Sequence, residues 1–305
     1  MSVAPPSQSA AAAQTLARRR GKAGLKGFAS WLLRLPWFPL LILLVVFFCA
    51  TVGPYVTPHD PGALNLSMAL KPPSWQIGGT AAYPLGTDNM GRDILSRMIL
   101  GAKISVIVAF WAILFSGAIG TLMGMFSGYF GGKIDMIIMR LVDIQMSVPA
   151  LALALILSAS LKPGMTTVIV VIVVTYWTWY ARIVRGEVLS LKERDFIALA
   201  RIAGCNAFMI LLKHFLPNIL NTLLVLATLQ LGSVIIYEAS LSFLGLGIQP
   251  PDVSWGLMLS DARPYISVAW WVITLPGLAI VLTCLGSNLF GDWLRDTLDP
   301  KRRQL

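Results

Sequence analysis

The chain contains few residues of the kinds that build metal or catalytic centres. Only 12% of its 305 residues are charged, and it has two histidines and three cysteines. No two cysteines stand in a C-x-x-C spacing, and their number is odd, so the sequence predicts neither a zinc site nor a disulfide framework. No Ser/His/Asp or Cys/His arrangement is readable. The composition therefore does not favour an enzyme, and no cofactor or metal is expected on this chain.

A phosphate-binding loop is also missing. The pairs Gly21-Lys22 and Gly132-Lys133 are followed by Ala and Ile, so neither completes the pattern G-x-x-x-x-G-K-[ST]. Residues 87–93 contain two aspartates and an asparagine, but they lack the glycine and glutamate positions of a calcium loop. We interpret this run as helix capping plus a network between Arg92 and Asp93.

What the chain has in abundance is apolar side chains. They make up 56% of the residues, and the mean hydropathy is +0.74. A soluble domain of this composition would expose large apolar patches, so the chain is expected in a lipid bilayer. The net charge of +10 could suggest a nucleic-acid partner. The basic residues instead bracket the apolar runs, as membrane topology requires, and no nucleic-acid partner is expected.

Six runs are long enough to cross a bilayer, which predicts an all-α integral membrane protein with six transmembrane helices. The runs are residues 37–56, 104–126, 140–161 with Pro149 inside, 165–182, 219–243 and 267–290. With the N-terminus inside, the cytosolic segments hold 18 Lys and Arg residues and the external segments hold six. This bias places both termini in the cytosol.

The expected organisation follows from these runs. It comprises a basic cytosolic tail (1–36), a first transmembrane helix (37–57), an external loop (58–100), a core of five helices (101–292) and a cytosolic tail (293–305). Within the external loop, Thr87 or Asp88 is expected to cap a short amphipathic helix that runs through Leu100.

Several polar or small residues inside the runs are candidates for special roles. Asp143, Gln145 and Gln230 are candidates for the pore or for polar contacts between helices. Glu238, near the outer end of the fifth run, either contacts solute or a binding protein, or has a structural role beside Tyr237, which we favour. A row of small residues every four positions predicts close helix packing, within the chain rather than at a dimer seam; it comprises Ser116, Gly120, Gly124 and Gly128.

The most informative stretch, residues 195–218, lies between the fourth and fifth runs and is too polar for lipid. It forms helix readily, begins with Asp195, and carries small residues at Ala198, Ala200, Ala203 and Gly204. A cytosolic helix with a face of small residues can seat against a soluble partner. The stretch is therefore interpreted as a docking helix from Asp195 to Leu212.

This stretch resembles the EAA loop of permease subunits in binding-protein-dependent ABC importers. The register is Ala198-Leu199-Ala200, three residues, Gly204, nine residues, and then His214-Phe215-Leu216-Pro217. Ala198, Leu199 and His214 depart from the general pattern, in the way the oligopeptide/dipeptide/nickel branch does. Three further segments are similar to that branch, and the single first span and the tail resemble its C-type permease; the segments begin at Gly86, Glu238 and Gly291.

The resemblance implies a type I ABC importer permease with a cytosolic coupling helix at about 187–213. The implied coupling residues are Asp195, Ala198, Ala200, Gly204, His214, Leu216 and Pro217. Implied partners are a second permease in a heterodimer, two cytosolic ATPases that carry ATP and magnesium, and an extracytoplasmic solute-binding protein. The implied location is a bacterial inner membrane.

Di- or oligopeptides are the expected cargo, with nickel, glutathione or another small solute as the alternative. A different class, a secondary transporter, is less favoured, because no Lys or Arg lies inside the runs, away from their ends, and because of the docking stretch. An integral-membrane enzyme is disfavoured because the two histidines lie on opposite sides of the bilayer.

Overall fold

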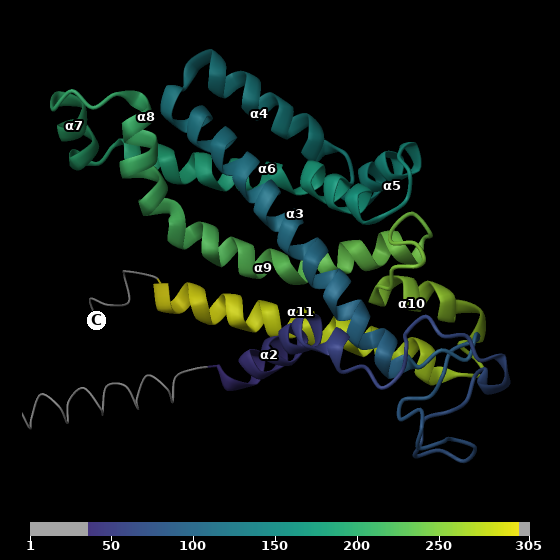
Figure 1. The fold of residues 1–305 in the computed structure, drawn as a ribbon. Helices are drawn as coiled ribbons and strands as arrows, with labels where there is room; N and C mark the ends of the chain where they lie inside the picture. Colours follow the sequence, from purple (N-terminus) through teal and green to yellow (C-terminus); the bar gives the residue numbers. More distant parts are fainter. Residues whose placement is uncertain (1–35, 299–305) are drawn as a thin grey trace, which may run out of the picture. The chain divides into compact units, whose positions relative to one another are not determined.

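The computed structural model describes residues 36–298. Residues 38–298 belong to one compact unit, which is all-α within the described range (Figure 1). Its longer helices are α2 (Trp37–Thr51), α3 (Ile94–Phe130), α4 (Gly132–Ser147), α5 (Ala150–Ser160), α6 (Met165–Lys192), α9 (Leu216–Phe243) and α11 (Trp270–Leu298). Shorter elements are α7 (Asp195–Ile202), α8 (Ala207–Met209), α10 (Trp255–Ala262), a π-helix (Ile210–Phe215) and the 3₁₀ turns Gly53–Tyr55, Leu66–Met68 and Arg263–Tyr265.

Four helices among the described residues are long and apolar enough to cross a membrane: α3, α6, α9 together with the turns before it, and α11. The pair α4 and α5 passes the same test only as one broken span, bent by 90°. The break falls at Val148, which has extended backbone angles because it precedes Pro149. The expected third run is thus two helices rather than one. The first run forms α2, which has 15 residues and is shorter than an ordinary span.

The segment before α3 differs from the expectation. The prediction of a short helix from Thr87 or Asp88 to Leu100 is wrong, because α3 begins at Ile94 and is 37 residues long. Asp93 is the N-cap, and its carboxylate accepts a hydrogen bond from the Ser96 N–H at 3.0 Å. Thr87 is occupied elsewhere, since its hydroxyl accepts from the Lys71 N–H at 2.9 Å and donates to the Met68 carbonyl.

The row of small residues packs α3 against α6. A Cβ added to Gly120 would lie 2.3 Å from the Trp177 carbonyl oxygen, and one added to Gly124 would lie 2.6 Å from that of Ala181. A Cβ added to Gly128 would lie 2.8 Å from the Val188 side chain, and Ser116 is buried. Only glycine allows two backbones this close. The row is therefore used within this chain.

Two groups of buried apolar residues hold the unit together. The larger joins the first halves of α3 and α6, the second half of α9, and the helices α10 and α11, together with Ala154 of α5. The smaller is centred on Val184, Val188, Ile197, Ile210 and Phe215, and it lies under the connection between α6 and α9. We call it the connection core. It fixes the segment that the sequence singled out.

Candidate functional site

The connection between α6 and α9 (residues 193–215) begins with a helix much shorter than expected. Helix α7 has eight residues, from Asp195 to Ile202, and does not reach Leu212. It ends because Gly204 has a φ of +80°, in the left-handed region that glycine occupies without strain. The Gly204 N–H donates to the Arg201 carbonyl and the Cys205 N–H to that of Ala200, both at 3.0 Å. Gly204 thus terminates the helix and is not part of its face.

One face of α7 turns into the protein. Ile197 and Ala200 are buried in the connection core beside Val188 and Phe215. The expectation that Ala200 contributes to an outward small-residue face is therefore wrong for the described chain. Ala198 and Gly204 are exposed, as is Asp195 in the first turn. A buried face of this kind ties α7 to the helices on both sides of it.

The opposite face of the connection is apolar and exposed. Leu199 is 64% exposed, Ile202 83% and Phe208 68%. We call these three residues the apolar ridge. Large apolar side chains that are exposed within one short segment commonly mark a surface that a partner covers. The ridge was not predictable from the sequence, because Ile197 and Leu199 are both apolar and only two residues apart, although they lie on opposite faces of α7.

The connection joins α9 through a π-helix. Pro217 has no N–H to donate to the carbonyl four residues earlier, and its ring would clash with that carbonyl in a regular α-helix. The wider Ile210–Phe215 turn accommodates the proline, and the Leu216 N–H donates to the Leu211 carbonyl. The Asn218 side chain donates to the His214 carbonyl at 2.6 Å. The His214 ring lies 6.3 Å from that of Phe196, which links this turn to α7.

The connection is also held at the ends of α3 and α6. The Lys192 ammonium donates to the Tyr129 carbonyl at 2.9 Å, and the Arg201 guanidinium lies over the Tyr129 ring. Arg185 of α6 forms two hydrogen bonds with Asp135 of α4, at 2.5 and 2.7 Å. These contacts tie the connection to the ends of α3 and α6.

The three residues expected in the pore or in polar contacts between helices, Asp143, Gln145 and Gln230, have different surroundings. Asp143 is exposed and pairs with Arg182 at 2.5 Å. The Gln145 amide donates to the Val174 carbonyl at 2.5 Å and accepts from the Trp177 indole at 2.9 Å, so it joins α4 to α6. Gln230 is half-buried on α9.

Glu238 is completely buried on α9. Its carboxylate accepts hydrogen bonds from Ser105 of α3 at 3.2 Å and from Ser242 at 2.7 Å, and a third from Ser254, the N-cap of α10. The Ser242 hydroxyl in turn accepts from the Ile248 N–H at 3.0 Å. This arrangement joins three helices, and the carboxylate does not reach solvent in this conformation.

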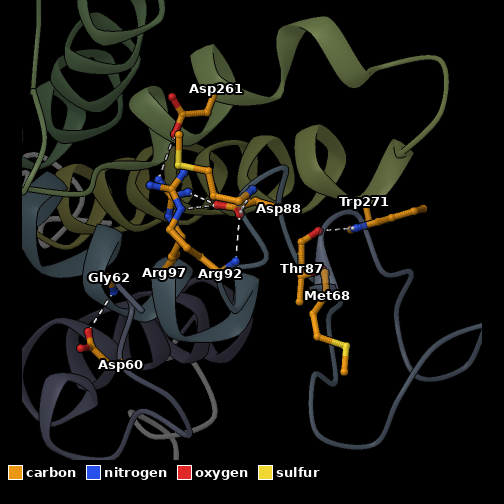
Figure 2. A network of polar contacts seen from close by, with 10 residues as sticks. Asp60, Gly62, Met68, Thr87, Asp88, Arg92, Arg97, Asp261 and Trp271 are labelled. Carbon is orange, nitrogen blue, oxygen red and sulfur yellow. Dashed lines mark hydrogen bonds and ion pairs between the residues drawn. The ribbon is translucent and has the colours of Figure 1, made fainter. Parts of the chain in front are cut away.

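A second polar cluster joins α3 to α10 at the same end of the unit (Figure 2). Arg92 donates to Asp88 at 2.6 Å, Arg97 also donates to Asp88, and both arginines reach Asp261 at 3.1 Å. Arg97 is only 2% exposed. The expected partner of Arg92, Asp93, instead caps α3. The sequence could not indicate Asp261, which lies 164 positions after Arg97.

Comparisons with known proteins agree with this architecture. The family described as the inner membrane component of binding-protein-dependent transport systems matches residues 120–304. The chain belongs to this family. It is therefore a multi-pass, non-catalytic permease component of an inner membrane, and the matched residues include the whole connection between α6 and α9.

Individual relatives extend the match toward the N-terminus. The permease is 43% identical to the di/tripeptide transport system permease protein of Pseudomonas aeruginosa over 262 residues, 86% of each chain. It is 42% identical to the dipeptide transport system permease protein of Escherichia coli over 265 residues, 87% of this chain and 88% of that one. The inward-facing MetNI methionine ABC transporter shares the fold, with a TM-score of 0.56 and 20% identity, over 66% of this chain and 96% of that one.

Proposed function

We propose that this permease forms half of the translocation pathway of an ATP-driven importer for di- and oligopeptides. Membership of a binding-protein-dependent family supports an importer over a secondary transporter. Support for peptide cargo comes from the names of relatives about 40% identical over most of both chains, which are dipeptide and di/tripeptide permeases. Nothing in the described structure favours nickel or glutathione.

The apolar ridge carries the coupling part of the proposal. Leu199, Ile202 and Phe208 would seat in a recess of a cytosolic ATPase, while Ile197 and Ala200 hold the other face of α7 on the connection core. ATPase closure would then push α7 and move α6 and α9 as rigid levers. His214, Leu216 and Pro217 would fix the angle between the connection and α9. Asp195 would stabilise the first turn of α7 through the helix dipole.

The proposed assembly has two permeases, two ATPases and a solute-binding protein. ATP and magnesium would be bound by the ATPases. Six spans are proposed for this permease: α2, the bent pair α4–α5, and the four long helices. Both termini would be cytosolic, as the Lys and Arg distribution favours. Residues 58–93 and the α9–α11 connection would then face the binding protein.

Purification of the tagged permease from its native membrane, followed by mass spectrometry, tests the assembly. Two ATPases and a second permease should co-purify in a detergent that preserves other membrane complexes. A permease that purifies alone, or only with copies of itself, would contradict the proposal.

A further inference from the structure

The same end of the unit that carries the apolar ridge contains a cleft between α6, α9 and α11. Helices α9 and α11 touch at two glycines: a Cβ added to Gly232 would lie 3.1 Å from the Cys284 Cα, and one added to Gly291 would lie 2.7 Å from the Leu229 Cδ2. Beyond Gly291 the helices separate toward their ends at Leu216 and Leu298. The cleft has a volume of about 680 Å³, within the range of small-molecule sites.

The lining of the cleft divides into an apolar floor and a polar rim. Val225, Leu226 and Leu229 of α9 form the floor, beside the Gly291 contact. The rim carries an acid, two bases and three uncharged polar residues; these are Glu187, Arg194, Arg295, Asn218, Asn221 and Thr222. This lining differs from that of the other large grooves of the unit, whose walls are almost wholly apolar.

The charges of the rim do not neutralise one another. Within residues 36–298, no ion pair engages Glu187, Arg194 or Arg295. Glu187 accepts one hydrogen bond, from the Thr222 hydroxyl at 3.2 Å. Elsewhere in the unit, carboxylates such as Asp88, Asp135 and Asp143 do pair with arginines. A cleft whose charges of both signs form no ion pair among the described residues fits a ligand that itself carries both signs.

We infer that this cleft binds the two charged ends of a short peptide. Arg295 and Arg194 would bind the terminal carboxylate, Glu187 the terminal ammonium, and Asn221 the peptide bond, while the floor receives the side chains. A dipeptide is about 7 Å long when extended, and the apolar floor does not select one side chain. The inference rests on the proposed peptide function and assigns an exit site at the end of the pathway beside the ATPases.

A photoreactive dipeptide tests the inference on the complete complex of both permeases and both ATPases in proteoliposomes. The probe is an alanyl dipeptide with a diazirine side chain, and its adducts are mapped by mass spectrometry. Adducts are expected on residues 187–194, 218–229 and 295–298, and unlabelled dialanine should suppress them. The same probe acetylated at its N-terminus and amidated at its C-terminus should label the cleft at least tenfold less.

Two variants test the charges. Glu187→Gln and Arg295→Gln each remove one charged partner, which should raise the dialanine concentration needed for half-suppression roughly tenfold. The matched control Arg140→Gln, on the exposed surface of α4, should not change it. Equal labelling by the blocked probe, or variants that label like the native protein, would overturn the inference.

ATP-driven dipeptide uptake by the same proteoliposomes separates the two claims. Uptake without adducts in the cleft, as expected if an ATPase or the second permease covers it, overturns the exit site and leaves the peptide importer standing. Adducts that depend on free termini, in a complex that takes up no peptide, support the cleft and contradict the proposed function. A complex that shows neither uptake nor adducts would contradict both the exit site and the proposed function.

Discussion

The substitution Ile202→Asp tests whether the apolar ridge seats on an ATPase. Ile202 is 83% exposed in the described unit, so the change should alter the stability of the permease by no more than about 0.5 kcal/mol. If a partner buries this side chain, its loss removes about 1.5–3 kcal/mol of binding free energy, and a buried carboxylate adds a desolvation cost. The affinity for the ATPase should therefore fall by roughly 10- to 150-fold.

The assay compares the amount of ATPase retained by tagged permease, and its ATP-driven transport, at equal permease abundance. Ile266→Asp is the matched control, because Ile266 is 59% exposed at the other end of the unit, beside the turn Arg263–Tyr265. Ile197→Asp gives the opposite pattern: Ile197 is fully buried in the connection core, so abundance itself should fall. An Ile202→Asp permease of normal abundance that retains its ATPase and transports normally would refute the role given to the ridge.

Four further changes follow from the geometry. Gly204→Ala should weaken the end of α7 by about 1–2 kcal/mol because of the left-handed φ, and Gly204→Asn should weaken it less; proteolysis of the connection measures this. Asp88→Asn should lower thermal stability by about 3 kcal/mol, since it leaves a buried arginine without one partner, whereas Asp261→Asn, at a 33% exposed side chain, should cost clearly less. Glu238→Leu should lower abundance by leaving three serine hydroxyls without the acceptor of their proton, at about 1–3 kcal/mol, without changing cargo preference in uptake assays. Gly120→Ala should destabilise the α3–α6 contact by about 1–3 kcal/mol in detergent unfolding, because the added methyl would overlap a backbone carbonyl; unchanged melting would contradict that packing.

The position of the connection was predictable from the sequence, but its shape was not. Two apolar runs around a polar stretch, and the spacing from Ala198 to Pro217, placed it between the fourth and fifth runs. Composition does not reveal that Gly204 adopts a φ of +80° and ends the helix after eight residues. It also does not tell an exposed leucine from a buried isoleucine on a helix that is apolar on both faces.

The sequence predicts the packing of the long apolar helices better than it predicts the polar clusters. The four-residue spacing from Ser116 to Gly128 requires a neighbouring helix at close range, and α6 is that neighbour. The partners of Asp88 and Glu238 come from α3, α9 and α10 and depend on the tertiary fold. The break at Pro149 was only partly predictable, because a proline in an apolar run can either kink a span or divide it.

The cleft between α6, α9 and α11 was also not predictable from the sequence, because its residues are brought together only by the tertiary fold. Glu187, Asn221 and Arg295 come from three helices, and no pattern in the sequence groups them. Their proximity depends on the contact between Leu229 and Gly291, beyond which the two helices separate.

ATP-driven uptake by the reconstituted complex tests whether this permease is part of an ATP-driven peptide importer. Proteoliposomes that contain this permease, its co-purifying partners and the binding protein would be given a labelled dipeptide. Uptake should require ATP hydrolysis and should persist when ionophores abolish every ion gradient. Uptake that follows an ion gradient without ATP, with the permease present and the ATPases omitted, would contradict it.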